Sequence, residues 1–282
     1  MLLRSIKIFF VLNLFLVTFA NIFPGEVELK WNFKDNVIAY KVTYYDESKN
    51  RDITLLKDII GKEGSIISYP KKMSMTVLLK KVQNNEIEVG FFLDPVSQAK
   101  KNSNNNNENE IDMRELIKGQ EGKLVIRGRL DQRGDITSYW LRSSQKNLLA
   151  LLFELPTKAI KIDDTWKLEI SLIALDPNFI YQSGNRINQV LLKEIIKNEQ
   201  GDNIAICEYK IREKLIGKSS VGDIDWKMYF DGVGRFNIDK GQWESMRFIN
   251  TNKMQGGISA DKTQLITIEP ISTIPIELLQ KL

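Results

Sequence analysis

Apolar and polar residues alternate along most of this chain, which is the pattern of strands with one buried face. Val27, Leu29, Trp31 and Phe33 alternate with polar neighbours. The same period of two continues in later runs, namely residues 38–44, 87–93, 124–130, 166–172, 203–211 and 226–230. We therefore predict a mainly β protein built as an antiparallel meander.

Short polar turns separate these runs. They are Asn84-Asn85, residues 131–134 (DQRG), Gly201-Asp202 and residues 239–241 (DKG). Gly, Asn and Asp tolerate the positive φ that tight hairpins require. The only clear helical pattern is one short helix near 145–154, with Ser143 or Ser144 as its cap and Pro156 as its stop.

The two halves of the chain resemble each other. Residues 77–93 are echoed by residues 190–209, since both begin with VLLK, and residues 122–140 are echoed by residues 232–248. This predicts two similar β-units, residues 21–155 and 156–282, that form one continuous curved half-barrel or sandwich. The alternative, that any two β-meanders look alike, stays open.

Two segments do not follow the strand pattern. Residues 1–20 carry Arg4 and Lys7 before an apolar run that ends in Ala20, which is typical of a secretory signal peptide. We expect an exported, periplasmic or extracellular protein, with an uncleaved N-terminal anchor as the alternative. Residues 94–114 include an Asn-rich stretch almost without apolar residues, which predicts a disordered loop.

Composition excludes several kinds of chemistry. The chain has no histidine and one cysteine, so an imidazole base, a histidine metal cluster, a CxxC pair and an intrachain disulfide are excluded. Cys207 shares a strand face with apolar residues and is expected to be buried and inert. The 40 basic and 36 acidic residues are interspersed, which does not favour nucleic acid as a partner.

The remaining candidates for catalysis are carboxylates. The densest clusters are Asp163-Asp164, Asp223 with Asp225, and Asp231. A glycosidase needs two carboxylates facing one cleft, whereas Asp also stabilises turns through its own backbone. We interpret these residues as turn formers, and expect no catalytic residue, no metal and no cofactor.

The tryptophans are the candidate ligand-facing residues, because indole offers a flat apolar face and one donor. Trp31, Trp166 and Trp226 lie on the apolar faces of their strands, where core packing is the competing interpretation. Trp243 has Ser245 and Arg247 as same-face neighbours and is therefore a candidate surface aromatic.

Two motifs carry a resemblance. Residues 155–166 (LPTKAIKIDDTW) and residues 232–241 (GVGRFNIDKG) resemble the pattern of uncharacterised secreted or envelope-associated bacterial β-proteins. Those proteins usually carry Gly where this chain has Asp163. The resemblance covers residues 155–250 best and implies a secreted β-fold, with no site residues to carry over.

Three functions follow from these patterns. The first is a non-enzymatic envelope protein that binds a lipid or another apolar ligand inside its curved sheet. The second is a structural or interaction module that offers sheet edges to a protein partner. The third is a carboxylate glycosidase. A large apolar cavity would favour the first, and a filled core with an exposed apolar patch the second.

Overall fold

The computed structural model describes most of the expected strands. The described residues are 25–47, 53–54, 66–68, 70–96, 110–112, 119–140, 146–173, 178–219, 222–256 and 260–282. The expected signal peptide, the helix cap and most of the Asn-rich loop lie outside them.

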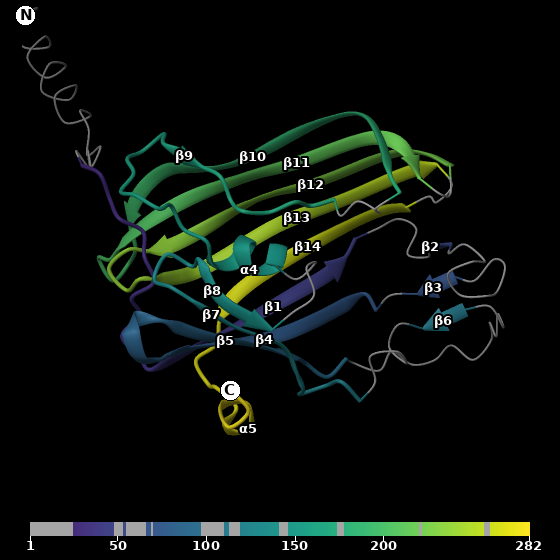
Figure 1. The fold of residues 1–282 in the computed structure, drawn as a ribbon. Helices are drawn as coiled ribbons and strands as arrows, with labels where there is room; N and C mark the ends of the chain where they lie inside the picture. Colours follow the sequence, from purple (N-terminus) through teal and green to yellow (C-terminus); the bar gives the residue numbers. More distant parts are fainter. Residues whose placement is uncertain are drawn as a thin grey trace, which may run out of the picture.

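One curved antiparallel sheet of 11 strands forms most of the molecule (Figure 1), as the alternation predicts. Its strand order is β8-β7-β5-β4-β1-β14-β13-β12-β11-β10-β9. The strands are β1 (Val37–Asp46), β4 (Lys72–Lys81), β5 (Ile87–Leu93), β7 (Leu124–Leu130), β8 (Ile136–Trp140), β9 (Thr165–Trp166), β10 (Ile180–Lys197), β11 (Asn203–Ser219), β12 (Gly222–Asn237), β13 (Gln242–Gly256) and β14 (Ala260–Pro270).

A second, small sheet joins β2 (Ile53–Thr54), β3 (Ile66–Ser68) and β6 (Glu110–Asp112) in that order. The β3–β6 pair is parallel. Because β6 falls within residues 94–114, the predicted disordered loop contains a short strand.

The large sheet combines strands from both halves of the chain. Strand β1 pairs with β4 on one side and with β14 on the other, so the first and last strands join the two meanders at the centre. The sheet is not closed into a barrel, because β8 and β9 are its two ends and do not pair with each other.

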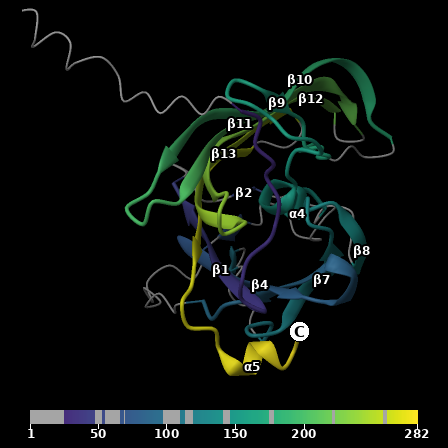
Figure 2. The ribbon, with the colours of Figure 1, turned by 90° about the vertical axis from the view of Figure 1, so that its left-hand side faces the viewer.

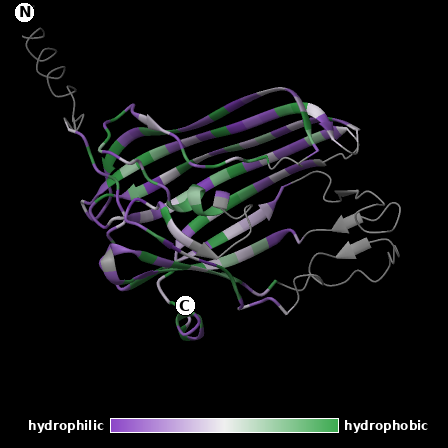
Figure 3. Cartoon of the chain, in the orientation of Figure 1, coloured by the Kyte–Doolittle hydropathy of each residue, from purple (hydrophilic) through white to green (hydrophobic). Residues whose placement is uncertain are grey.

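The sheet curls around helix α4 (Lys146–Phe153), which lies on its concave side (Figure 2). The helix occupies the predicted position and buries Leu149 and Leu152 in the main core. Figure 3 colours each residue by hydropathy and shows hydrophobic and hydrophilic residues following one another along the long strands. Burying one face of a sheet and one side of a helix against each other removes a large apolar area from water.

Residues 27–33 do not form the predicted strand. Leu29, Trp31 and Phe33 are buried, but the main chain forms only one isolated bridge, between Val27 and Ile160. Its backbone bonds go to separate partners, since Trp31 N–H donates to the Gln132 carbonyl and Asn32 N–H to the Gly241 carbonyl. The alternation therefore marks burial here without a neighbouring strand.

The convex face carries a second apolar cluster. Leu278 and Leu282, in and just after helix α5 (Ile276–Leu279), pack on Ala39, Leu78 and Phe92. Helix α5 thus lies outside the curl (Figure 2). No helix within the described ranges has the length and apolar character needed to cross a membrane.

The predicted turns have the backbone that their residues favour. Asn85, Gly134, Gly201 and Gly241 have φ values of 60°, 82°, 86° and 60°. The turn prediction is therefore confirmed at all four positions.

A polar network holds the hairpin ends beside Gly201, and it predicts a pH effect. Asp202 Oδ2 accepts from Lys240 Nζ at 2.6 Å and from Asn237 Nδ2 at 3.0 Å. Lys240 and then Asn237 hold the pKa of Asp202 at about 2, below its ordinary 3.8. A lowered carboxylate pKa gives stability that is present above the unfolded pKa and is lost as the pH falls towards the folded pKa.

We therefore expect Asp202→Asn to lower the melting temperature at neutral pH, with a difference from wild type that shrinks between about pH 4 and pH 2. Thermal unfolding of both proteins across this range measures it. A difference that is the same at all pH values would contradict the assignment.

Candidate functional site

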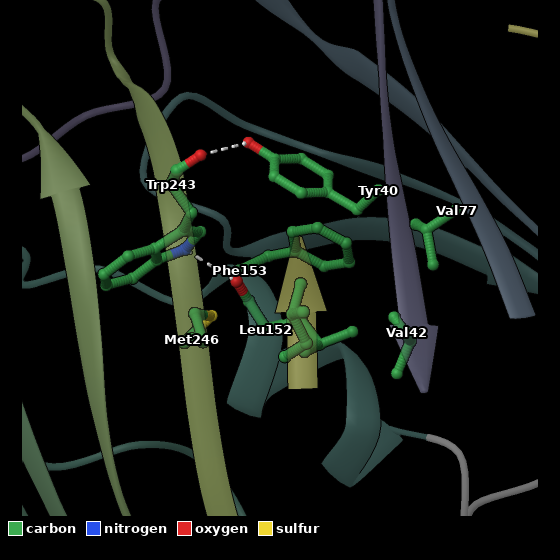
Figure 4. Close-up of a pocket in the computed structure, with 8 residues that line it drawn as sticks. Tyr40, Val42, Val77, Leu152, Phe153, Trp243 and Met246 are labelled. Carbon is green, nitrogen blue, oxygen red and sulfur yellow. Dashed lines mark hydrogen bonds between the residues drawn. The ribbon is translucent and has the colours of Figure 1, made fainter. Parts of the chain in front are cut away.

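Side chains of the described residues pack closely between helix α4 and the sheet. The void between the two halves of the sheet and α4 has a volume of about 10 Å³. It is lined by side chains that include Tyr40, Leu152, Trp243 and Met246 (Figure 4). This volume is that of a single water probe, so it leaves no room for a lipid.

Two of the four candidate tryptophans form this filled core. The Trp31 indole N–H donates to the Phe153 carbonyl at 2.8 Å, and the Trp243 indole N–H donates to the Leu152 carbonyl at 2.9 Å. These bonds satisfy carbonyls at the C-terminal end of α4, which have no partner within the helix. Both tryptophans therefore fasten α4 to the sheet.

Trp243 is buried, which corrects the surface interpretation. The register of β12 and β13 shifts between Arg235 and Phe236, which pair with Ser245 and Trp243. The resulting bulge at Glu244 adds one residue, so Trp243 faces the core although the simple alternation predicts otherwise. Its ring lies over Gly234, where an added Cβ would come within 2.7 Å of the indole.

The other two tryptophans are half-buried. Trp166 lies in the two-residue strand β9. Trp226 lies on β12 and donates from its indole nitrogen to Asn252 Oδ1 at 2.8 Å.

The candidate carboxylates occupy turns and surface ion pairs. Asp164 accepts from the Lys161 backbone N–H, which is a turn contact. Asp225 forms an ion pair with Lys227, and Asp231 forms a bidentate ion pair with Arg212. No group of three potential metal-ligating side chains occurs within the described part of the chain.

Cys207 is buried and forms no disulfide, as its strand face predicts. Burial raises the pKa of its thiol far above the ordinary value. Since the thiolate is the reactive form, this residue is inert.

The outer margin of β10 is covered by a described strand over only a small part of its length. Strand β9 pairs only with Val190 and Leu191. Asn188 extends this contact through its side chain, accepting from the Leu168 N–H and donating to the Leu168 carbonyl. From Ile187 back to Ile180, no described strand pairs with the outer side of β10. We call this segment, Ile180–Ile187, the free edge.

The free edge is exposed and carries apolar side chains at its start. Every residue from Ile180 to Arg186 is exposed. Ile180 is 65% exposed and Tyr181 is 56% exposed. An unpaired strand margin presents backbone N–H and C=O groups that can pair with another strand. This segment has one charge, on Arg186, so charge does little to block such pairing.

A bulge interrupts the free edge on its inner side. Tyr181 pairs with Gly217 and Ser183 with Ile216, so Gln182 has no partner in β11. Tyr181 and Gly184 therefore face the concave side together. An added Cβ at Gly184 would lie 3.1 Å from the Tyr181 ring, so glycine allows the ring to lean over the strand.

A pocket of about 270 Å³ adjoins the free edge on this concave side. Its lining combines apolar, polar and charged residues, which include Ile173, Tyr181, Asn185, Arg186, Glu213 and Leu215. It is thus continuous with the free edge, since three of these residues belong to it.

An ion pair fixes one wall of this pocket. Arg186 Nε lies 3.0 Å from Glu213 Oε1, and the side chains are 48% and 7% exposed. Glu213 Oε2 accepts from the Ile173 backbone N–H at 2.8 Å. One oxygen of the buried carboxylate therefore has a backbone donor, whereas Oε1 lies against the Arg186 guanidinium as an ion pair without a hydrogen bond. The arginine itself remains open to solvent.

Neither a protein-family model nor a curated protein matches this chain. The functional interpretation accordingly depends on the geometry of the free edge and its pocket.

Sequence reasoning missed these residues. Tyr181, Arg186 and Glu213 carry no motif, and the alternation is weak between residues 178 and 188. The available signal was a polar run, residues 182–186, ahead of the apolar residues 190–192. Such a run indicates a segment that extends beyond the core.

Proposed function

We propose that this protein is a non-enzymatic, exported module of a bacterial cell envelope that binds a partner protein by adding a strand of the partner to its free edge. The observation that carries this proposal is the unpaired, exposed margin of β10. Strand addition obtains its affinity from main-chain hydrogen bonds and its specificity from alternate side chains. It needs no catalytic residue.

The close packing under α4 favours this function over lipid carriage at that place. A void of about 10 Å³ under α4 cannot hold an acyl chain. The pocket of about 270 Å³ is smaller than the roughly 300–1,000 Å³ of ordinary small-molecule sites. An exposed edge beside a small pocket suits a side chain of a bound strand better than a whole lipid.

A site-specific cross-linker tests the proposal in the cell that exports the protein. We expect a photoreactive residue at Gln182, on the free edge, to give one defined protein adduct. The same residue at Ile249 should give none. Ile249 is 54% exposed, but it lies on β13, whose two margins are both paired.

A double variant distinguishes strand addition from non-specific cross-linking. Ile180→Asp with Tyr181→Asp should abolish the adduct and leave thermal stability nearly unchanged, because both side chains are exposed. Ile249→Asp is the matched control and should retain the adduct. The adduct segment, made as a peptide, should bind purified wild type and fail to bind the double variant. Equal cross-linking at both positions, or a stoichiometric lipid in the exported protein, would contradict the proposal.

A further inference from the structure

We infer that the strand accepted by the free edge carries a carboxylate side chain, which Arg186 binds in the adjoining pocket. This inference rests on the proposed function and specifies the chemistry of the partner. It concerns which strand binds, whereas the proposed function concerns whether any strand binds.

The register of β10 places the pocket beside the added strand. Glu213, Leu215 and Gly217 of β11 pair with Arg186, Gly184 and Tyr181. These β10 residues share the concave side, so a strand added alongside them directs alternate side chains to the same side. Cross-strand neighbours lie about 5 Å apart, within reach of a guanidinium group.

Arg186 is prepared for an anion. Its Nε lies beside Glu213, and no other described residue forms a hydrogen bond or ion pair with its two terminal amino groups. Those groups form a planar fork that matches the two oxygens of a carboxylate. Because Arg186 Nε lies 3.0 Å from Glu213 Oε1, the guanidinium already lies at the pocket before a strand binds.

A cationic side chain fits the same pocket poorly. Glu213 is only 7% exposed, its Oε2 accepts from the Ile173 N–H, and its Oε1 lies 3.0 Å from Arg186 Nε. The charge that reaches solvent is therefore the positive one, on Arg186. The remaining walls include Ile173, Tyr181 and Leu215, which suit the methylene groups of an acidic side chain.

Matched peptides test the inference on the full-length protein. The probe is a strand-forming peptide of alternating Val and Thr with one central Glu, and its controls carry Gln or Lys at that position. We expect the Glu peptide to bind about three- to tenfold more tightly than the Gln peptide at low salt, with a smaller ratio at high salt. Calorimetry or fluorescence titration measures the three dissociation constants.

The outcomes separate this inference from the proposed function. If all three peptides bind equally well, the strand site stands and the preference for a carboxylate is wrong. If the Lys peptide binds best, the inference is also wrong. If none binds, strand addition itself fails. A dimer of the protein through the free edge, detected by light scattering, would replace the partner strand with a second copy.

Two protein variants test whether Arg186 is the residue that binds the carboxylate. Arg186→Gln alone leaves Glu213 buried without its ion pair, which destabilises the fold. The double variant Arg186→Gln with Glu213→Gln replaces the pair with two amides and should bind the Glu and Gln peptides equally. Glu213→Gln alone keeps an acceptor for Ile173 and removes a competing anion, so it should strengthen binding of the Glu peptide about twofold or more. A preference for Glu that survives in the double variant would overturn the inference.

Discussion

Trp31→Ala is expected to lower the free energy of unfolding by about 3–5 kcal/mol, the range for large-to-small changes at buried aromatic residues. The Trp31 ring contacts those of Tyr40, Phe153 and Phe236, with centroid distances of 6.4, 5.6 and 5.9 Å. Its indole also donates to the Phe153 carbonyl. The loss therefore combines a cavity, three ring contacts and an unsatisfied carbonyl at the end of α4.

Urea unfolding measures this effect, and Trp31→Phe is the control. The phenyl ring keeps most of the apolar contact but cannot donate, so the control should lose less, about 1–3 kcal/mol. Because ordinary domains are stable by about 5–15 kcal/mol, the alanine variant should unfold at a clearly lower urea concentration. A loss below about 1 kcal/mol would mean that residues 27–33 are not part of the core.

Gly134→Ala is expected to destabilise the protein by about 2–5 kcal/mol, because it combines backbone strain with a clash. Gly134 has φ 82°, where an L side chain is strained. An added Cβ would lie 1.8 Å from the Phe153 carbonyl oxygen and 2.9 Å from the Glu154 nitrogen. Neither contact can relax without moving the end of α4 away from this turn.

Gly201→Ala is the matched control for Gly134→Ala. Gly201 has φ 86°, yet an added Cβ there meets nothing within 4 Å. It should therefore show only the strain, about 1–2 kcal/mol. Thermal unfolding of both variants measures the difference, which reports the contact with α4. Equal losses at the two positions would mean that this contact is absent in solution.

Local features of the fold were predictable from the sequence. A turn depends on a few neighbouring residues, which is why the positive φ at Gly134 and Gly201 followed from residue type alone. The short helix followed from its apolar run and from Pro156. The buried Cys207 followed from a strand with strict alternation.

Features that depend on distant partners were not predictable. The bulge at Glu244 reverses the facing of Trp243, and it depends on the pairing of β13 with β12. Residues 27–33 alternate as a strand would, but their partners Gln132 and Gly241 lie more than a hundred residues away. Alternation reports which side chains are buried, and it does not report which main chain lies alongside.

Asp163 was predictable from the sequence only in part. Its φ is 72°, in the region that favours glycine. The resemblance suggested by the sequence leads us to expect Gly at this position. An unusual residue at a turn was therefore visible in the sequence, whereas its strained backbone required the structure.

The free edge belongs with the unpredictable features. Whether Ile180–Ile187 has a neighbour depends on where β9 ends, and β9 pairs with only two residues of β10. The ion pair between Arg186 and Glu213 likewise depends on the register of β10 and β11. Composition gives no hint of either.

Amide hydrogen exchange along β10 shows whether the free edge accepts a strand. In the free protein, the amides of Ile180–Ile187 that point away from β11 should exchange quickly, and those of Val190 and Leu191, where β10 is paired on both sides, slowly. Excess Glu-containing strand peptide should slow exchange in Ile180–Ile187 and leave Val190 and Leu191 unchanged. Slow exchange across Ile180–Ile187 before any peptide is added, or protection that appears only elsewhere in the sheet, would contradict a free edge that accepts a strand.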